Sequence, residues 1–178
     1  MPELKRARKL DPTHKRNVIP RGIGDAALVV VVCLLTYTIA AVVWGWTVPT
    51  LAIEVMPDLS AESVPGTEDA KFEAFGRAIL TTSCIAFVAS IWAFVTRVRS
   101  LSMMLWLGLV TGFGSLWFVV LGNTVARATH PAPASHPEPG QTIEALSPIS
   151  LSPALLLAPT LALLFYWVAS SFVDSRKF

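Results

Sequence analysis

The composition of this chain excludes an ordinary soluble domain. Of its 178 residues, 53% are hydrophobic and 15% are charged, with a mean hydropathy of +0.59, whereas soluble domains carry about 25% charged residues. The formal net charge of +2 says little, because it averages over two very different sides of a membrane.

Four apolar stretches of about 20 residues or more can each cross a hydrocarbon core about 30 Å thick as an α-helix. We therefore predict an all-α fold, an integral membrane four-helix bundle with both termini cytoplasmic. The spans run over about 26–48, 75–95, 101–123 and 153–173. The predicted parts are a basic cytoplasmic N-terminal tail (1–23), a four-span membrane domain (24–173) with outer loops at about 49–74 and 124–150, and a cytoplasmic C-terminus (174–178).

Positive charge gathers on one side of these spans. Eleven of the fourteen Lys and Arg residues lie before the first span, in the short link between the second and third spans, or after the fourth span. Only Lys71, Arg77 and Arg127 lie on the other side. The positive-inside bias predicts a multi-pass plasma-membrane protein with both termini inside.

The seven positive charges of the N-terminal tail predict contact with anionic lipid headgroups, each contributing about 1 kcal/mol. The alternative is an acidic cytoplasmic partner. We expect no nucleic-acid binding, because no aromatic residues are interleaved with the charges.

The first span ends in Trp44-Gly45-Trp46-Thr47-Val48-Pro49. It is too long for a signal peptide, and its two tryptophans are typical of an anchor at the outer surface. Asp25 is interpreted as an N-terminal helix residue. Tyr37 lies at mid-depth, so we expect its hydroxyl to bond to a neighbouring helix.

Cys33 and Cys84 lie within the first two predicted spans. A disulfide between them would require the two helices to face each other at that depth. We interpret both as small packing residues.

Small residues form stripes on the second and third spans, including the pair Gly108-x-x-x-Gly112. The link Thr96–Ser100 permits only an antiparallel hairpin, so we expect the second and third spans to be neighbours whose small faces meet. In the alternative, the GxxxG face forms a homodimer. In the fourth span, Pro159 predicts a bend, either a tolerated irregularity or a hinge.

The first outer loop is expected to begin irregularly and then turn helical, with Glu73 and Arg77 paired across one turn. The second contains the Pro-rich segment His130–Gly140, which is typical of a solvated tether. A metal site from His130, His136 and Glu138 would require this segment to fold around the ion.

Chemistry-bearing patterns are missing from the sequence. The middle third of each span has no Asp, Glu, Lys, Arg or His, which argues against a proton-coupled transporter. No nucleotide, hydrolase or metalloprotease motif occurs. We assign no catalytic, cofactor-binding or metal-binding residue and predict no cofactor.

The layout resembles an uncharacterised four-span family of actinobacteria, the domain of unknown function 2567. The likeness lies in the segment Trp44–Pro49, the outer helix at Phe72–Gly76, the Arg97–Arg99 turn, the glycines of the third span and Pro159. It covers about 24–173. It implies four spans and a plasma-membrane address, and no catalytic residues.

Our leading functional hypothesis is a non-enzymatic accessory or scaffold subunit of a membrane or cell-envelope complex, with an unknown membrane protein partner. The alternative is a small oligomeric pore or solute carrier, lined by Thr36, Thr38, Thr81, Thr82 and Ser83. The least favoured is a membrane enzyme acting on lipid, for which Glu73 with Arg77 is the nearest polar pair.

Overall fold

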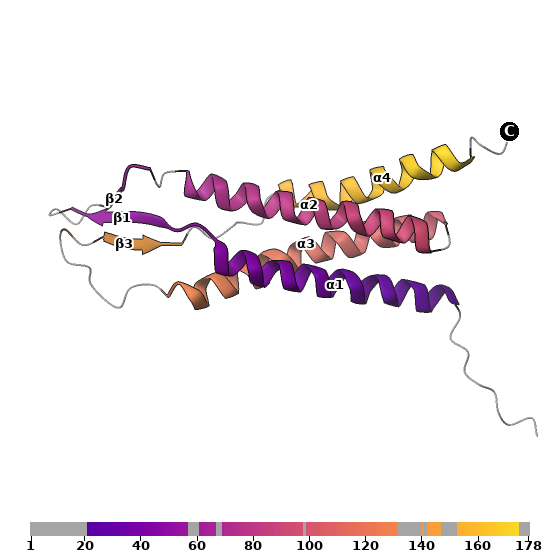
Figure 1. The fold of residues 1–178 in the computed structure, drawn as a ribbon, viewed down its shortest axis with the longest axis horizontal. Helices are drawn as coiled ribbons and strands as arrows, with labels where there is room; N and C mark the ends of the chain where they lie inside the picture. Colours follow the sequence, from indigo (N-terminus) through magenta and orange to yellow (C-terminus); the bar gives the residue numbers. More distant parts are fainter. Residues whose placement is uncertain are drawn as a thin grey trace, which may run out of the picture.

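The fold is a bundle of helices that carries a small sheet at one end (Figure 1). The computed structural model describes residues 21–56, 61–66, 69–97, 99–131, 140, 142–146 and 153–174. The N-terminal tail up to residue 20, the Pro-rich residues 132–139 and the C-terminal residues 175–178 lie outside this description, and so do the predictions that fall on them.

Four α-helices are present among the described residues. They are α1 (Arg21–Thr47), α2 (Ala70–Thr96), α3 (Leu101–Thr129) and α4 (Leu157–Asp174), which follows the 3-10 turn η1 (Pro153–Leu156). Three of them, α1, α2 and α3, are long and apolar enough to cross a membrane, and α4 is a shorter apolar helix. The described chain is therefore mostly helical, with three candidate membrane spans.

The neighbours of each helix differ from the sequence prediction. The most closely packed pairs are α1 with α3 and α2 with α4, followed by α3 with α4. The tight turn between α2 and α3 makes them antiparallel, but they pack against each other less than against the other two helices. The expectation that their small faces meet is wrong.

Glycines of α3 explain this arrangement. A Cβ built on Gly108 would lie 2.8 Å from Leu163 of α4, and one on Gly114 would lie 2.4 Å from the ring of Tyr37 of α1. A Cβ built on Gly122 would likewise lie 2.8 Å from the indole ring of Trp44 of α1. The glycines therefore accept bulky side chains from α1 and α4. The GxxxG face is used within the chain, with α4 as the partner helix.

A three-stranded sheet at the far end from the α2–α3 turn corrects the all-α prediction (Figure 1). Strand β1 (Leu51–Val55) is central and pairs antiparallel with β2 (Ala61–Ser63) and β3 (Thr142–Ala145). Ile53 of β1 lies opposite Ile143 of β3. The sheet thus joins the two loops, and β3 follows the Pro-rich segment that was predicted to be a tether.

The start of the fourth helix shows how the chain accommodates Pro159. Residues Pro153–Leu156 form the 3-10 turn, and the α-helical geometry begins at Leu157. Pro159 therefore lies in the first turn of α4, where an amide without an intrahelical acceptor is normal. The change of helix type precedes Pro159, and the predicted bend at Pro159 stays a prediction.

Candidate functional site

The described surface has a groove between α1 and α2, which we call the α1–α2 groove. It consists of two cavities of about 660 and 410 Å³ that share Thr36, Cys84 and Ile85 in their walls. Its outer end reaches Thr47 and Arg77, and its inner end reaches Trp92. The groove therefore follows most of the length of both helices.

Small side chains keep this groove open. Its walls include Ala40 of α1 and Ala89 of α2, together with the exposed thiol of Cys84. On the opposite sides of the two helices, Tyr37 packs on α3 and Ser90 donates a hydrogen bond to the carbonyl of Ala162 in α4, at 3.2 Å. Each helix thus has its closest packing with a different partner. Tyr37 and Trp44 of α1 still donate to the carbonyls of Thr82 and Ala74 on α2, and the groove lies at the surface of this seam.

The outer end of the groove carries charge. The Arg77 guanidinium pairs with the Glu73 carboxylate one turn earlier, as predicted, and lies 3.5 Å from the carbonyl of Thr47 on α1. Both side chains of the pair are about half exposed. The pair is an exposed intrahelical salt bridge.

Beyond the inner end lies an ion pair that the sequence did not reveal. Arg97, just after α2, donates to the carboxylate of Asp25 on α1 at 2.7 Å, and their side chains are 18% and 25% exposed. The same guanidinium lies 5.1 Å from the centre of the Trp92 ring. Asp25 is therefore a link between α1 and α2 at this end.

The hydroxyls proposed to line a polar path are distributed over several faces. Thr36 and Thr81 line the α1–α2 groove, but each donates to the backbone carbonyl four residues earlier. Thr82 is buried and bonds within α2, and Thr38 accepts a hydrogen bond from the indole of Trp117 on the α3 side. Ser83 lines neither half of the groove. The described structure does not gather these residues along one route.

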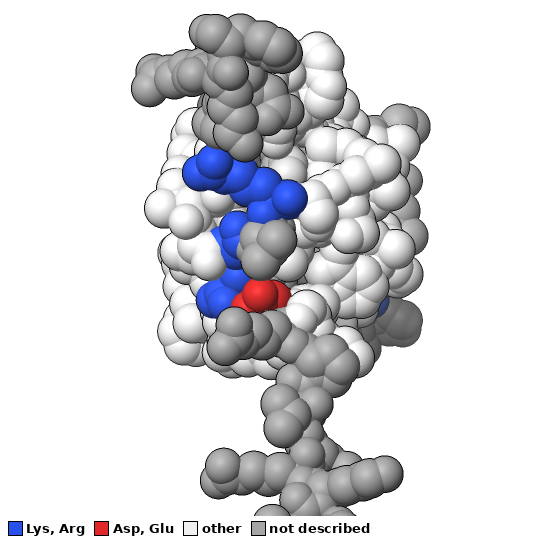
Figure 2. Space-filling view, turned by 90° about the vertical axis from the view of Figure 1, so that its right-hand side faces the viewer, with Lys and Arg blue, Asp and Glu red and all other residues white. Residues whose placement is uncertain are grey.

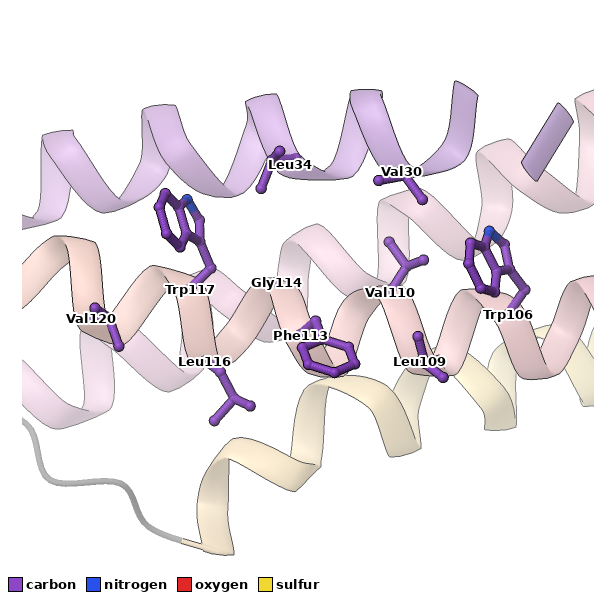
Figure 3. Close-up of a pocket in the computed structure, with 10 residues that line it drawn as sticks. All are labelled: Val30, Leu34, Trp106, Leu109, Val110, Phe113, Gly114, Leu116, Trp117 and Val120. Atoms are coloured by element: carbon purple, nitrogen blue, oxygen red, sulfur yellow. The ribbon is translucent and has the colours of Figure 1, made fainter. Parts of the chain in front are cut away.

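A second groove, of about 500 Å³, lies on the outside of α1 and α3 and is apolar throughout (Figure 3). Trp106 and Trp117 lie on its α1 side, where their indoles donate to the carbonyl of Ala26 and the hydroxyl of Thr38. Phe113, at its lip, is 65% exposed. Large aliphatic and aromatic side chains of this kind suit contact with lipid.

Two predicted aromatic roles have different outcomes. The Tyr37 hydroxyl donates to the carbonyl of Thr82 on α2 at 3.3 Å, which confirms its expected bond to a neighbouring helix. Trp44, however, is 5% exposed, contacts Phe118 and donates to the carbonyl of Ala74. It is a core residue, so its predicted role as a surface anchor is wrong. Trp46, which is 63% exposed, remains suited to that role.

The side chains that could bind a metal are scattered over the described ranges. No group of three or more His, Cys, Asp or Glu lies close enough to hold a metal ion. Cys33 and Cys84 are both free, and both line the inner half of the α1–α2 groove. His136 and Glu138 lie outside the described residues.

Comparison with known protein families, with curated proteins and with solved structures finds no match to this chain.

Proposed function

We propose that this protein is a non-enzymatic accessory or scaffold subunit of a membrane or cell-envelope complex, and that the α1–α2 groove receives one transmembrane helix of its partner. The observation that carries the proposal is the open seam between α1 and α2. A likeness to the four-span actinobacterial family is consistent with this role and remains part of the proposal.

The length of the groove favours a helix over a lipid tail. From Arg77 to Trp92 the groove follows about 22 Å of α2, at roughly 1.5 Å per residue. An acyl chain reaches only to the bilayer midplane, about 15 Å from either surface. A transmembrane helix matches the full length.

The walls of the groove also suit a helix. Side chains of Ala40, Ala89 and Cys84 allow a second backbone to approach closely, and such contact drives helix association in lipid. Both grooves also contain large aliphatic and aromatic side chains, but the groove on the outside of α1 and α3 has no Ala, Cys or Thr in its walls. It therefore provides a control surface on the same molecule.

Filling the groove is expected to remove the partner. With Ala89→Leu, the added side chain occupies the seam, and we expect co-purification of a stoichiometric partner from mild detergent to fall about tenfold, equivalent to about 1.4 kcal/mol. Val120→Leu is the matched control, because it lies in the groove on the outside of α1 and α3. It should leave recovery of the partner unchanged.

The position of the contact can be tested with the native thiol. A photocrosslinker on Cys84, in a Cys33→Ala background, should capture the same partner, while one on Phe113→Cys in a cysteine-free background should not. Crosslinks only to lipid, or free monomer at native expression, would contradict the proposal.

We further propose four spans with both termini in the cytoplasm, supported by the charge distribution. A single cysteine at Thr142→Cys in β3 is then expected to react with a membrane-impermeant maleimide in intact cells. One at Leu101→Cys, at the α2–α3 turn, should react only after lysis. Native cysteines are replaced by alanine in both. The reverse labelling pattern would invert the orientation.

A further inference from the structure

We propose that the protein binds the phosphate of an anionic phospholipid in a pocket at the end of the bundle that carries the α2–α3 turn. The pocket, of about 300 Å³, lies between the start of α3 and the last turns of α4. We call it the turn pocket. The residues lining it are Arg99, Ser100, Leu101, Met104, Tyr166, Trp167 and Ser170.

The first feature of the turn pocket is a fixed cation. The Arg99 guanidinium lies 4.5 Å from the centre of the Phe94 ring, and Phe94 in turn meets the edge of Tyr166 at 5.6 Å between ring centres. These contacts hold the exposed guanidinium at the rim. Figure 2 shows that the described basic residues at this end form a band across the surface.

The second feature is the N-terminus of α3. Ser100 is the N-cap, and its hydroxyl accepts from the amide of Met103 at 3.1 Å. The amides of Leu101 and Ser102 have no intrahelical acceptor at this position, and they add the positive end of a long helix dipole. Phosphate groups bind readily at such helix starts.

The third feature is independent of the helix and indicates an unfilled ligand position. Tyr166 is 2% exposed, and its buried hydroxyl has no hydrogen-bond partner in the described part of the chain. A buried unpaired hydroxyl is costly unless a partner is supplied. A phosphate oxygen entering the pocket would accept its hydrogen bond.

The surroundings favour a lipid over a soluble phosphate. None of the seven lining residues is acidic, and Trp167, which is 60% exposed, lies beside the pocket. Tryptophan at a membrane interface packs against lipid at headgroup level. This inference depends on the proposed insertion of the bundle in a bilayer, but not on the α1–α2 groove or its partner.

The test is lipid retention by the purified full-length protein in detergent, counted by native mass spectrometry with phosphatidylglycerol or phosphatidylcholine added. Measurement at about 0.5 M salt weakens general attraction by the charges of the N-terminal tail. We expect one phosphatidylglycerol to be retained at least tenfold more tightly than phosphatidylcholine. Arg99→Gln should weaken it about tenfold, because a charge-assisted hydrogen bond is lost, and Tyr166→Phe about threefold.

Controls separate this site from general attraction of anions. Arg127→Gln removes a charge from the last turn of α3 and should leave retention unchanged, as should Thr160→Val on α4. An equal loss of phosphatidylglycerol retention in Arg99→Gln and Arg127→Gln would overturn the proposal. Equal retention of phosphatidylglycerol and phosphatidylcholine would overturn it as well. Displacement by millimolar glycerol phosphate would overturn the assignment to a lipid. Circular dichroism of each variant should show unchanged helicity, which excludes misfolding as the cause of reduced lipid retention.

Discussion

Gly114→Ala is expected to destabilise the bundle by about 2 kcal/mol, in the range measured for overpacked cores. A Cβ at this position would lie 2.4 Å from two ring carbons of Tyr37. Tyr37 is fully buried, and its hydroxyl bonds to the carbonyl of Thr82 on α2. The ring therefore has no free space to move into, and α1 must shift away from α3.

Gly112→Ala is the matched control, two residues away on the same helix. Its Cβ would meet Pro159 at 3.7 Å, an ordinary van der Waals contact. Because alanine favours helix over glycine by up to about 1 kcal/mol, we expect this variant to be as stable as the native protein or slightly more so. Unfolding in mixed micelles of increasing SDS content measures the free energy of unfolding of both variants. Equal stability of the two variants would contradict the described packing of α1 on α3.

Asp25→Asn is expected to lower the free energy of unfolding by about 2 kcal/mol, between the values for exposed and fully buried pairs. The substitution removes the carboxylate that accepts from Arg97 at 2.7 Å. Arg97 then keeps a mostly buried guanidinium, whose Nε has no partner among the described residues. The same unfolding assay measures the loss.

Glu73→Gln is the control for Asp25→Asn, because it breaks the other ion pair. The Glu73–Arg77 pair is intrahelical and half exposed, so its loss should cost at most about 0.5 kcal/mol. The exchange Asp25→Arg with Arg97→Asp should recover part of the stability if the pair links α1 to α2. A deficit of the same size in Asp25→Asn and Glu73→Gln would show that the inner pair has no special role.

These two contacts also define the groove on which the functional proposal depends. Tyr37 in the Gly114 recess fixes α1 to α3, and the Asp25–Arg97 pair joins α1 to α2 at one end. Between this pair and Arg77, the small side chains leave the seam open. Loss of either contact should therefore alter partner recovery as well as stability, while Gly112→Ala should alter neither.

The three-stranded sheet corresponds to an alternation of residues that is visible in the sequence. Leu51, Ile53 and Val55 alternate with smaller or charged residues, and Thr142–Ala145 shows the same alternation. A period of two is typical of a half-buried strand. Neither segment is long enough to predict a strand alone, because each depends on pairing with a strand about 90 residues away.

The sequence by itself determined that α1, α2 and α3 are long and apolar enough to cross a membrane, and it determined the tight antiparallel turn and the Glu73–Arg77 pair. Each follows from local composition, spacing or a neighbour one helical turn away. Only the tertiary structure decided that α3 packs on α1 and α4, that Trp44 belongs to the core, and that Asp25 meets Arg97. Lipid gives no hydrophobic preference among helix faces, so partners are chosen by the fit of side chains into recesses on distant helices. The spacing of residues in the sequence does not indicate which side chain fits which recess.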